Sequence, residues 1–151
     1  MKVPETIRKE HEELHGQLAA ATREPGRVGE AARVVAKIMH PHFLREDEYA
    51  MPPLLLLKPL SQGRFDPAMA EILPQVERLR SEMPLMLEEH KAIVGALNEL
   101  EQVAIAEGRP GIAVFAAELK LHAAHEEEIL YPAALLVGEI VKAKLPQPVR
   151  V

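Results

Sequence analysis

Apolar residues recur at three- and four-residue intervals along most of the chain, a spacing that gathers side chains on one face of an α-helix. The pattern predicts four principal helices, at about residues 5–22, 28–50, 83–107 and 112–131, and no strands. In the second helix the residues expected to face inward are Val34, Val35, Ile38, Phe43 and Leu44.

Prolines set the expected boundaries and irregularities of these helices. Pro41 lies in the middle of the second helix and is expected to kink it. Pro74 and Pro84 are expected to break the third helical region, which begins near Asp66, into a leading segment and a main helix from about Met83. A long connection, residues 52–65, precedes this region.

The end of the chain is expected to add one short helix. Pro132 should end the fourth helix, and residues 133–144 then form an amphipathic tail. This tail either packs over one end of the helices or joins a second copy of the chain. Together with the apolar stretch Leu54–Leu57, it is a candidate contact for a homodimer.

The composition narrows the class of protein. Apolar residues make up 48% of the 151 positions and aromatic residues only 3%, which suits a single domain, residues 1–151, with an aliphatic core. Cysteine is absent, which excludes disulfides, thiolate catalysis and cysteine-ligated iron–sulfur clusters. A net charge of −5 without a basic cluster argues against nucleic acid as a partner. Because no apolar run suits a signal peptide or a membrane span, we expect a cytoplasmic protein without membrane partners.

Two segments share one arrangement of histidine and carboxylate residues. In His42-x-x-x-Glu46 and in His122-x-x-x-Glu126, two more acids follow the glutamate and a proline lies six residues beyond it. Residues four apart share one face of a helix, so each segment directs an imidazole and a carboxylate toward the same point. Two such helices facing each other would form a metal pocket of nitrogen and oxygen donors.

A second repeated feature strengthens this interpretation. Glu10-His11 recurs as Glu89-His90, each with an apolar residue three positions after the histidine. The two lone histidines are 79 residues apart, and the histidines of the two longer segments are 80 residues apart. The chain therefore reads as two copies of one unit, a helix with a lone histidine followed by a helix with His-x-x-x-Glu.

In this order of motifs the chain resembles the haemerythrin-like family, which carries the HHE cation-binding domain. The resemblance covers about residues 5–132. It implies an all-α fold, an antiparallel up-down-up-down four-helix bundle, to which the sequence adds a short extra C-terminal helix. It also implies a non-haem di-iron centre inside the bundle. Members bind or sense oxygen or nitric oxide, handle iron or take part in stress responses.

Transferred residue by residue, the resemblance implies six metal ligands. Four histidines would be terminal ligands of two iron ions joined by an oxo or hydroxo bridge, and two glutamates could bridge the ions as well. These residues are His11, His42, Glu46, His90, His122 and Glu126. Imidazole and carboxylate donors also suit zinc and manganese.

One position departs from the oxygen-carrying haemerythrins, which place two histidines four apart on the third helix. Here Val94 follows His90 at that interval, whereas His15 follows His11 on the first helix. If the two repeats are related by a pseudo-twofold axis, His15 occupies the mirror position. Our hypothesis is that His15 supplies the fifth imidazole.

Two structural alternatives compete with a metal site of this kind. Surface pairs four residues apart would explain the motifs without metal. However, the residues expected to share the pocket face are apolar, namely Ile38, Phe43, Leu121 and Leu130, and unpaired charges there would be costly. A ferritin-like site requires Glu-x-x-His on two helices, and only Glu12-x-x-His15 fits.

Two classes of function follow from the resemblance. The first is a protein that binds or senses a small ligand, oxygen or nitric oxide, or handles iron. The second is a redox enzyme acting on peroxide or nitric oxide, which would need a separate electron-transfer partner. A purely structural zinc or manganese site is a third alternative.

Overall fold

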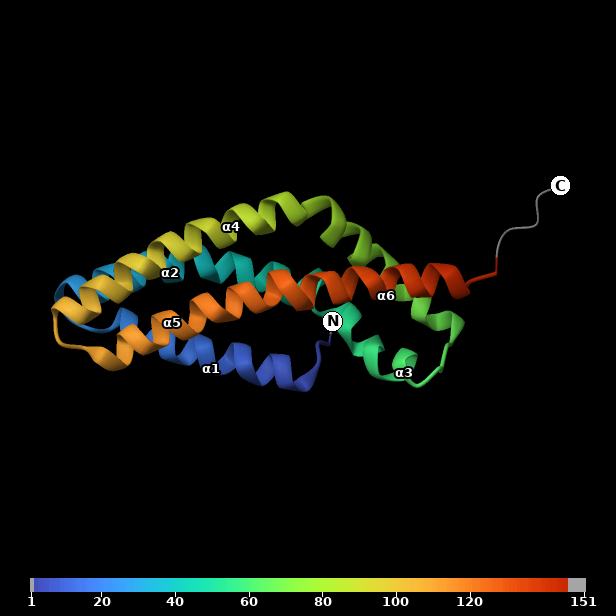
Figure 1. Cartoon of the computed structure of the whole chain (residues 1–151), viewed down its shortest axis with the longest axis horizontal. Coiled ribbons are helices and arrows are strands. Elements are labelled where there is room, and N and C mark those ends of the chain that lie inside the picture. Colours follow the sequence, from blue (N-terminus) through green and yellow to red (C-terminus); the bar gives the residue numbers. More distant parts are fainter. Residues whose placement is uncertain (1, 147–151) are drawn as a thin grey trace.

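The computed structural model describes residues 2–146, and its regular elements there are all helical, as the sequence predicts. Four long helices pack into a bundle (Figure 1). They are α1 (Glu5–Thr22), α2 (Gly26–Arg45), α4 (Leu73–Ala106) and α5 (Pro110–His125). Within the described range, no helix combines the length and the apolar character needed to cross a membrane.

α2 and α5 each run into a single π-helical turn, at Glu46–Ala50 and at Glu126–Leu130. In such a turn the backbone hydrogen bond spans five residues instead of four. The N–H of Met51 donates to the carbonyl oxygen of Glu46 at 2.9 Å, and the N–H of Tyr131 donates to that of Glu126. Both π-turns begin at the glutamate of a His-x-x-x-Glu segment, so the unusual backbone coincides with the repeated chemistry.

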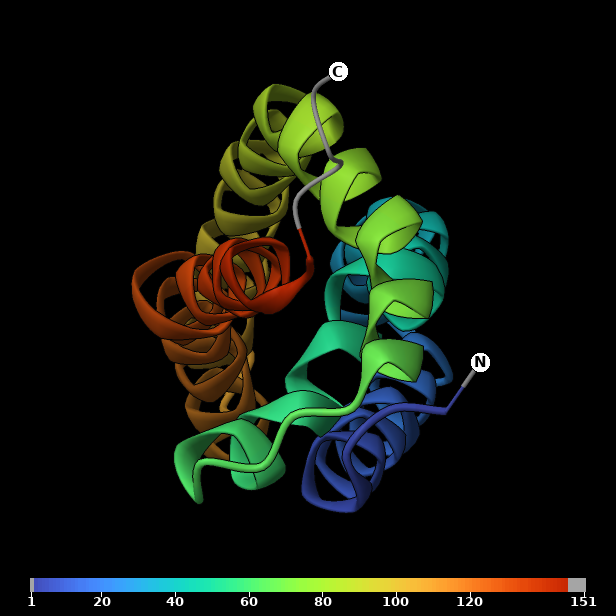
Figure 2. The ribbon, with the colours of Figure 1, turned by 90° about the vertical axis from the view of Figure 1, so that its right-hand side faces the viewer.

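The expected end of the fourth helix at Pro132 is wrong. After the π-turn an α-helix resumes as α6 (Tyr131–Lys144), with Pro132 in its first turn. Proline is tolerated there because the first N–H groups of a helix have no helical acceptor. The amphipathic tail is therefore the direct continuation of α5, and it packs against α4 at one end of the bundle (Figure 2).

The expected break of the third helical region at Pro84 is also wrong. α4 runs continuously from Leu73 to Ala106, with Pro74 in its first turn and Pro84 inside it. Pro84 and Arg80, whose carbonyl loses its helical partner to the proline, are both exposed, so water can bond that carbonyl. The helix bends instead of ending (Figure 1).

The connection between the two repeats is mostly helical. It contains a 3₁₀ turn, Pro52–Leu56, and the short helix α3 (Leu57–Ser61), and a second 3₁₀ turn, Pro67–Ile72, leads into α4. Leu54 is buried, whereas Leu55 and Leu57 are each 42% exposed. A homodimer through this segment stays a prediction.

The apolar core consists of two clusters at different heights of the bundle. The larger cluster includes Leu14, Leu18, Val35, Phe43, Ile93, Leu97, Phe115 and Leu119. The smaller one includes Tyr49, Met51, Leu54, Leu79, Met86, Tyr131 and Ala134. Along each of the four bundle helices, the residues of one cluster give way to those of the other at the position of a candidate metal ligand. The site thus lies between two apolar layers.

Three residues expected to face inward do not. Val34, Leu44 and Leu121 are 55%, 57% and 72% exposed. Val34 and Leu121 each neighbour a buried position, Val35 and His122, and adjacent helical residues point in directions about 100° apart. Apolar composition alone did not distinguish the buried neighbour from the exposed one.

Gly138 allows α6 to lie close to α4. A Cβ atom at Gly138 would lie 2.4 Å from Cγ1 of Val76, a fully buried residue. We expect Gly138→Ala to lower the free energy of unfolding by about 1–3 kcal/mol, the usual range for overpacking a core. Chemical denaturation measures this. Gly95→Ala is the matched control, because a Cβ there meets nothing within 4 Å and should stabilise the helix by about 0.5–1 kcal/mol. Equal stability of the two variants would contradict the close packing of α6.

Candidate metal centre

Six ionisable side chains are buried between the two apolar clusters, and they come from all four bundle helices and their π-turns. They are His11, His42, Glu46, His90, His122 and Glu126, each no more than 8% exposed. These are the six positions that the repeated motifs single out. Burying so many ionisable groups without compensation would be costly, so their partners decide what the site can do.

The first group of donors consists of His42, Glu46, His90 and Glu126, with one donor atom from each lying within 4.8 Å of the others. The two Nε2 atoms of His42 and His90 lie 2.9 Å apart. Oε1 of Glu126 lies 3.3 Å from Nε2 of His90, and Oε1 of Glu46 lies 3.7 Å from Nε2 of His42. Nitrogen and oxygen donors therefore converge on one small volume.

The second group consists of His11, His122 and the same Glu126. Oε2 of Glu126 lies 3.3 Å from Nε2 of His122 and 3.7 Å from Nε2 of His11. The two oxygens of Glu126 thus face different groups. A carboxylate placed in this way can bind two cations at once, whereas Glu46 belongs to the first group only.

Each of the four histidines has a carboxylate on the Nδ1 side of its ring. Within one repeat, Nδ1 of His11 lies 3.5 Å from Asp47, and Nδ1 of His90 lies 2.9 Å from Glu127. Between the repeats, Nδ1 of His42 lies 3.2 Å from Glu89, and Nδ1 of His122 contacts Glu10. The four pairs follow the internal repeat of the sequence, so each pair has a counterpart in the other half.

These carboxylates determine which ring nitrogen is free to bind a cation. A carboxylate beside Nδ1 holds a proton on that nitrogen and leaves the lone pair on Nε2. All four Nε2 atoms face the interior of the site, toward Glu126, Glu46 or another Nε2. The contacts of His42, His90 and His122 therefore favour the tautomer that a metal ion requires, whereas Nδ1 of His11 lies 3.5 Å from Asp47 without a hydrogen bond to it.

The sequence motifs did not identify Glu10 and Glu89 as carboxylate partners of the histidines. The signal was present, because both residues immediately precede a lone histidine in the repeat. They were missed because each reaches a histidine on a different helix of the other half. Glu89 also accepts a hydrogen bond from Arg45, which anchors it.

Burial and mutual charge shift the pKa values within the site. Burial and the neighbouring Glu126 raise the pKa of Glu46 well above its ordinary value. Burial opposes ionisation of Glu126 as well, but contacts with Glu46 and three histidines outweigh it and lower the pKa of Glu126 well below its ordinary value. Burial and the charge of His90 lower the pKa of His42. Burial also raises the pKa of Tyr131, assisted by the charge of Glu46.

Several buried nitrogen and oxygen atoms of the site have no hydrogen-bond partner among the described residues. They include Nε2 of His11 and His122, Oε1 of Glu46 and Oε2 of Glu126. In addition, the Nε2 atoms of His42 and His90 face each other at 2.9 Å, a distance at which two lone pairs would repel unless a cation or a proton lay between them. Metal cations would satisfy these atoms, so the residues fit a metal centre of imidazole and carboxylate ligands.

The other histidines lie apart from these two groups. His15 is half-buried one turn along α1 from His11, and its ring packs on Phe43 with the centroids 4.0 Å apart. Burial and the charge of His11 lower its pKa. Its role as a fifth imidazole stays a prediction. His40 and His125 are exposed.

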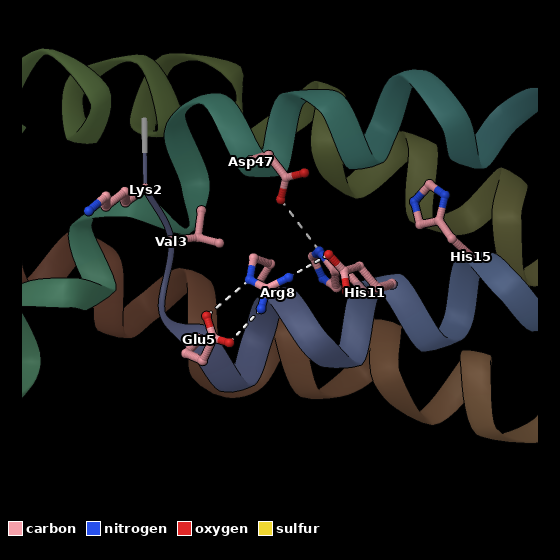
Figure 3. A pocket seen from close by; sticks show the side chains of 8 residues that line it. Lys2, Val3, Glu5, Arg8, His11, His15 and Asp47 are labelled. Carbon is pink, nitrogen blue, oxygen red and sulfur yellow. Dashed lines mark hydrogen bonds and ion pairs between the residues drawn. The ribbon is translucent and has the colours of Figure 1, made fainter.

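A cavity of about 800 Å³ opens beside His11 (Figure 3). Lys2, Val3, Glu5, Arg8, His11, Glu12, His15 and Asp47 line it. Arg8 is held by hydrogen bonds to Glu5 and Glu12, so its charge is compensated. The cavity thus borders His11, one of the three residues of the second group.

Substitution of Glu89 tests how much the carboxylates on the Nδ1 side of the histidines contribute to metal binding. We expect Glu89→Ala to weaken metal binding by about 10–100-fold, because His42 would lose the partner that fixes its tautomer and orientation. Competition against a chromophoric chelator measures the affinity. The adjacent Glu88 is exposed and, within residues 2–146, pairs only with Lys91, so Glu88→Ala is the matched control and should bind metal like the unaltered protein. Equal affinities of the two variants would show that Glu89 has no such role.

Comparison with known proteins places the chain in a family. Residues 2–134 match the family model described as "Hemerythrin HHE cation binding domain", which covers most of the chain and all six buried ionisable residues. Neither the curated proteins nor the solved structures gave a match.

Proposed function

The chain belongs to the hemerythrin HHE cation-binding domain family, and from this premise we propose that it binds two iron ions and, through them, a small ligand such as oxygen or nitric oxide. The observation that carries the proposal is the position of Glu126, whose two oxygens face two separate groups of buried donors. Oε1 of Glu126 faces Nε2 of His90, and its buried Oε2 has no hydrogen-bond partner among the described residues, which packing alone does not explain.

The residues divide between two ions. His42, His90 and Glu46 would hold the first ion, His11 and His122 the second, and Glu126 would join both. When bound, a pair of iron ions supplies redox chemistry and coordination positions for a diatomic ligand. The imidazoles would be oriented by the carboxylates on their Nδ1 side, which belong to Glu10, Asp47, Glu89 and Glu127. The apolar clusters above and below the site would keep bulk water from its interior.

The second group is the better candidate for ligand binding. It offers three protein side chains, one fewer than the first group, and therefore leaves more coordination positions open. It also lies beside the cavity that His11 and His15 line. We propose that a small ligand enters along this path, and that release of iron to other proteins would follow the same route.

Metal analysis combined with absorption spectroscopy tests this function. Protein purified in air should contain about two irons per chain and show near-ultraviolet bands that respond to dithionite, oxygen or nitric oxide. The variant His40→Ala, which alters only an exposed histidine, should behave identically. One zinc or manganese per chain, or no metal after anaerobic iron loading, would overturn the proposal. Catalytic turnover of peroxide or nitric oxide would instead assign the same centre to the enzymatic alternative.

A further inference from the structure

The hydroxyl of Tyr131 lies inside the first group of donors. Its oxygen is 2.7 Å from Oε2 of Glu46, 3.2 Å from Nε2 of His90 and 3.4 Å from Nε2 of His42. The side chain is 1% exposed, and its ring stacks against that of His90. Tyrosine was not among the residues that the sequence motifs identified as ligands.

The π-turn explains how Tyr131 comes to face this group. In an α-helix a residue five positions after Glu126 would point about 140° away from it. The π-turn Glu126–Leu130 bonds the N–H of Tyr131 to the carbonyl of Glu126, which brings the two side chains onto the same face. The first repeat has a π-turn at the same place, but there the corresponding residue is Met51.

The hydroxyl has more acceptors than it can satisfy. One O–H proton faces a carboxyl oxygen and two imidazole Nε2 atoms, and the hydroxyl can donate it to only one of them. At most one of the three contacts is a full hydrogen bond. A cation at the centre would satisfy all four atoms together.

The spacing of these four atoms matches a coordination shell. Oη of Tyr131, Oε2 of Glu46 and the Nε2 atoms of His42 and His90 are separated by 2.7, 2.9, 3.2 and 3.4 Å in the contacts given above. Neighbouring ligands about 2.1 Å from a six-coordinate metal ion are about 3 Å apart. The tyrosine oxygen therefore occupies the position of a ligand rather than that of a remote packing residue.

We propose that Tyr131 is a seventh metal ligand, binding through its phenolate oxygen to the ion that His42, His90 and Glu46 hold. This inference rests on the proposed iron binding. On coordination the O–H bond breaks, the oxygen keeps the electron pair and shares it with the metal, and the proton leaves to solvent. Because the first repeat carries Met51 at the corresponding position, the two ions differ in charge environment.

The ligand assignment can be tested by spectroscopy of tyrosine, because the chain contains only two tyrosines. Tyr49 is buried away from the site, with its hydroxyl bonded to Glu82 and contacting Met86. In Tyr49→Phe, Tyr131 is the sole tyrosine. Ferric protein of this variant should show a visible phenolate-to-iron absorption band, and its resonance Raman bands should shift when the protein is produced with ring-deuterated tyrosine. Tyr131→Phe, which keeps the ring that stacks on His90, should lose the band.

Each outcome is decisive when iron content is measured on the same samples. Tyr49→Phe with bound ferric iron but no phenolate band overturns the ligand assignment and leaves the proposed function intact. A band that survives in Tyr131→Phe overturns the assignment as well. Failure of the unaltered protein to bind iron overturns the proposed function and the ligand assignment together. Isotope-sensitive bands in Tyr49→Phe support the assignment even if Tyr131→Phe binds less iron.

Discussion

Glu126→Ala is expected to abolish binding of both metal ions. The loss of metal affinity should exceed about 100-fold, the upper end of the effect expected from removing a carboxylate that only contacts the Nδ1 side of a ligand histidine. Glu126 belongs to both groups of donors, and no other residue in the part of the chain that the structure describes does. Glu46→Ala, in contrast, removes a donor from the first group only and should retain binding at the second. Metal content after equilibration with iron, measured on each purified variant, distinguishes the two.

A neighbouring acid provides the control for Glu126. Glu128 is exposed, so Glu128→Ala changes the net charge by the same amount without touching the site. Helical circular dichroism shows whether each variant has folded. Two ions per chain in folded Glu126→Ala would show that the shared carboxylate is dispensable, and the division into two linked groups would then be wrong.

Removal of metal with a chelator should lower the melting temperature by about 5–11 °C. A ligand at 100 times its dissociation constant stabilises the native state by about 2.7 kcal/mol. For a chain of this size each kcal/mol corresponds to about 2–4 °C. The physical reason is that six buried ionisable side chains lose the cations that compensate them.

Scanning calorimetry with and without chelator measures this shift. Restoring iron should restore the melting temperature, and Glu126→Ala should show no shift because it has no metal to lose. A chelated protein that melts at the original temperature would mean that the buried histidines and glutamates are stable on their own, with a structural role only.

The repeated motifs predicted the helical bundle and brought six buried residues together because their geometry is local. His-x-x-x-Glu places two donors on one helical face whatever the rest of the fold does. The apolar residues beside these motifs were less informative, as exposed Leu121 shows, since a helical period cannot separate neighbouring positions at the edge of a buried face.

The features that the sequence did not predict depend on contacts beyond one helix or on an altered period. The π-turns at Glu46 and Glu126 have a five-residue hydrogen bond that a period of 3.6 residues does not contain, so the position of Tyr131 was hidden. Glu10 and Glu89 were missed because they reach histidines in the other half of the chain. The continuity of α4 through Pro84 depends on the exposure of that turn, which only the packed structure reveals.

The carboxylate pairs that cross between the two halves also set an order of events during protein synthesis. His122 and Glu10 are separated by 112 residues, and both groups of donors need Glu126. A nascent chain that has emerged only as far as α4 therefore has His11, His42, Glu46 and His90 but lacks the residue common to both groups. If the two groups bind metal ions as proposed, uptake of the pair must accordingly follow synthesis of the π-turn that begins at Glu126.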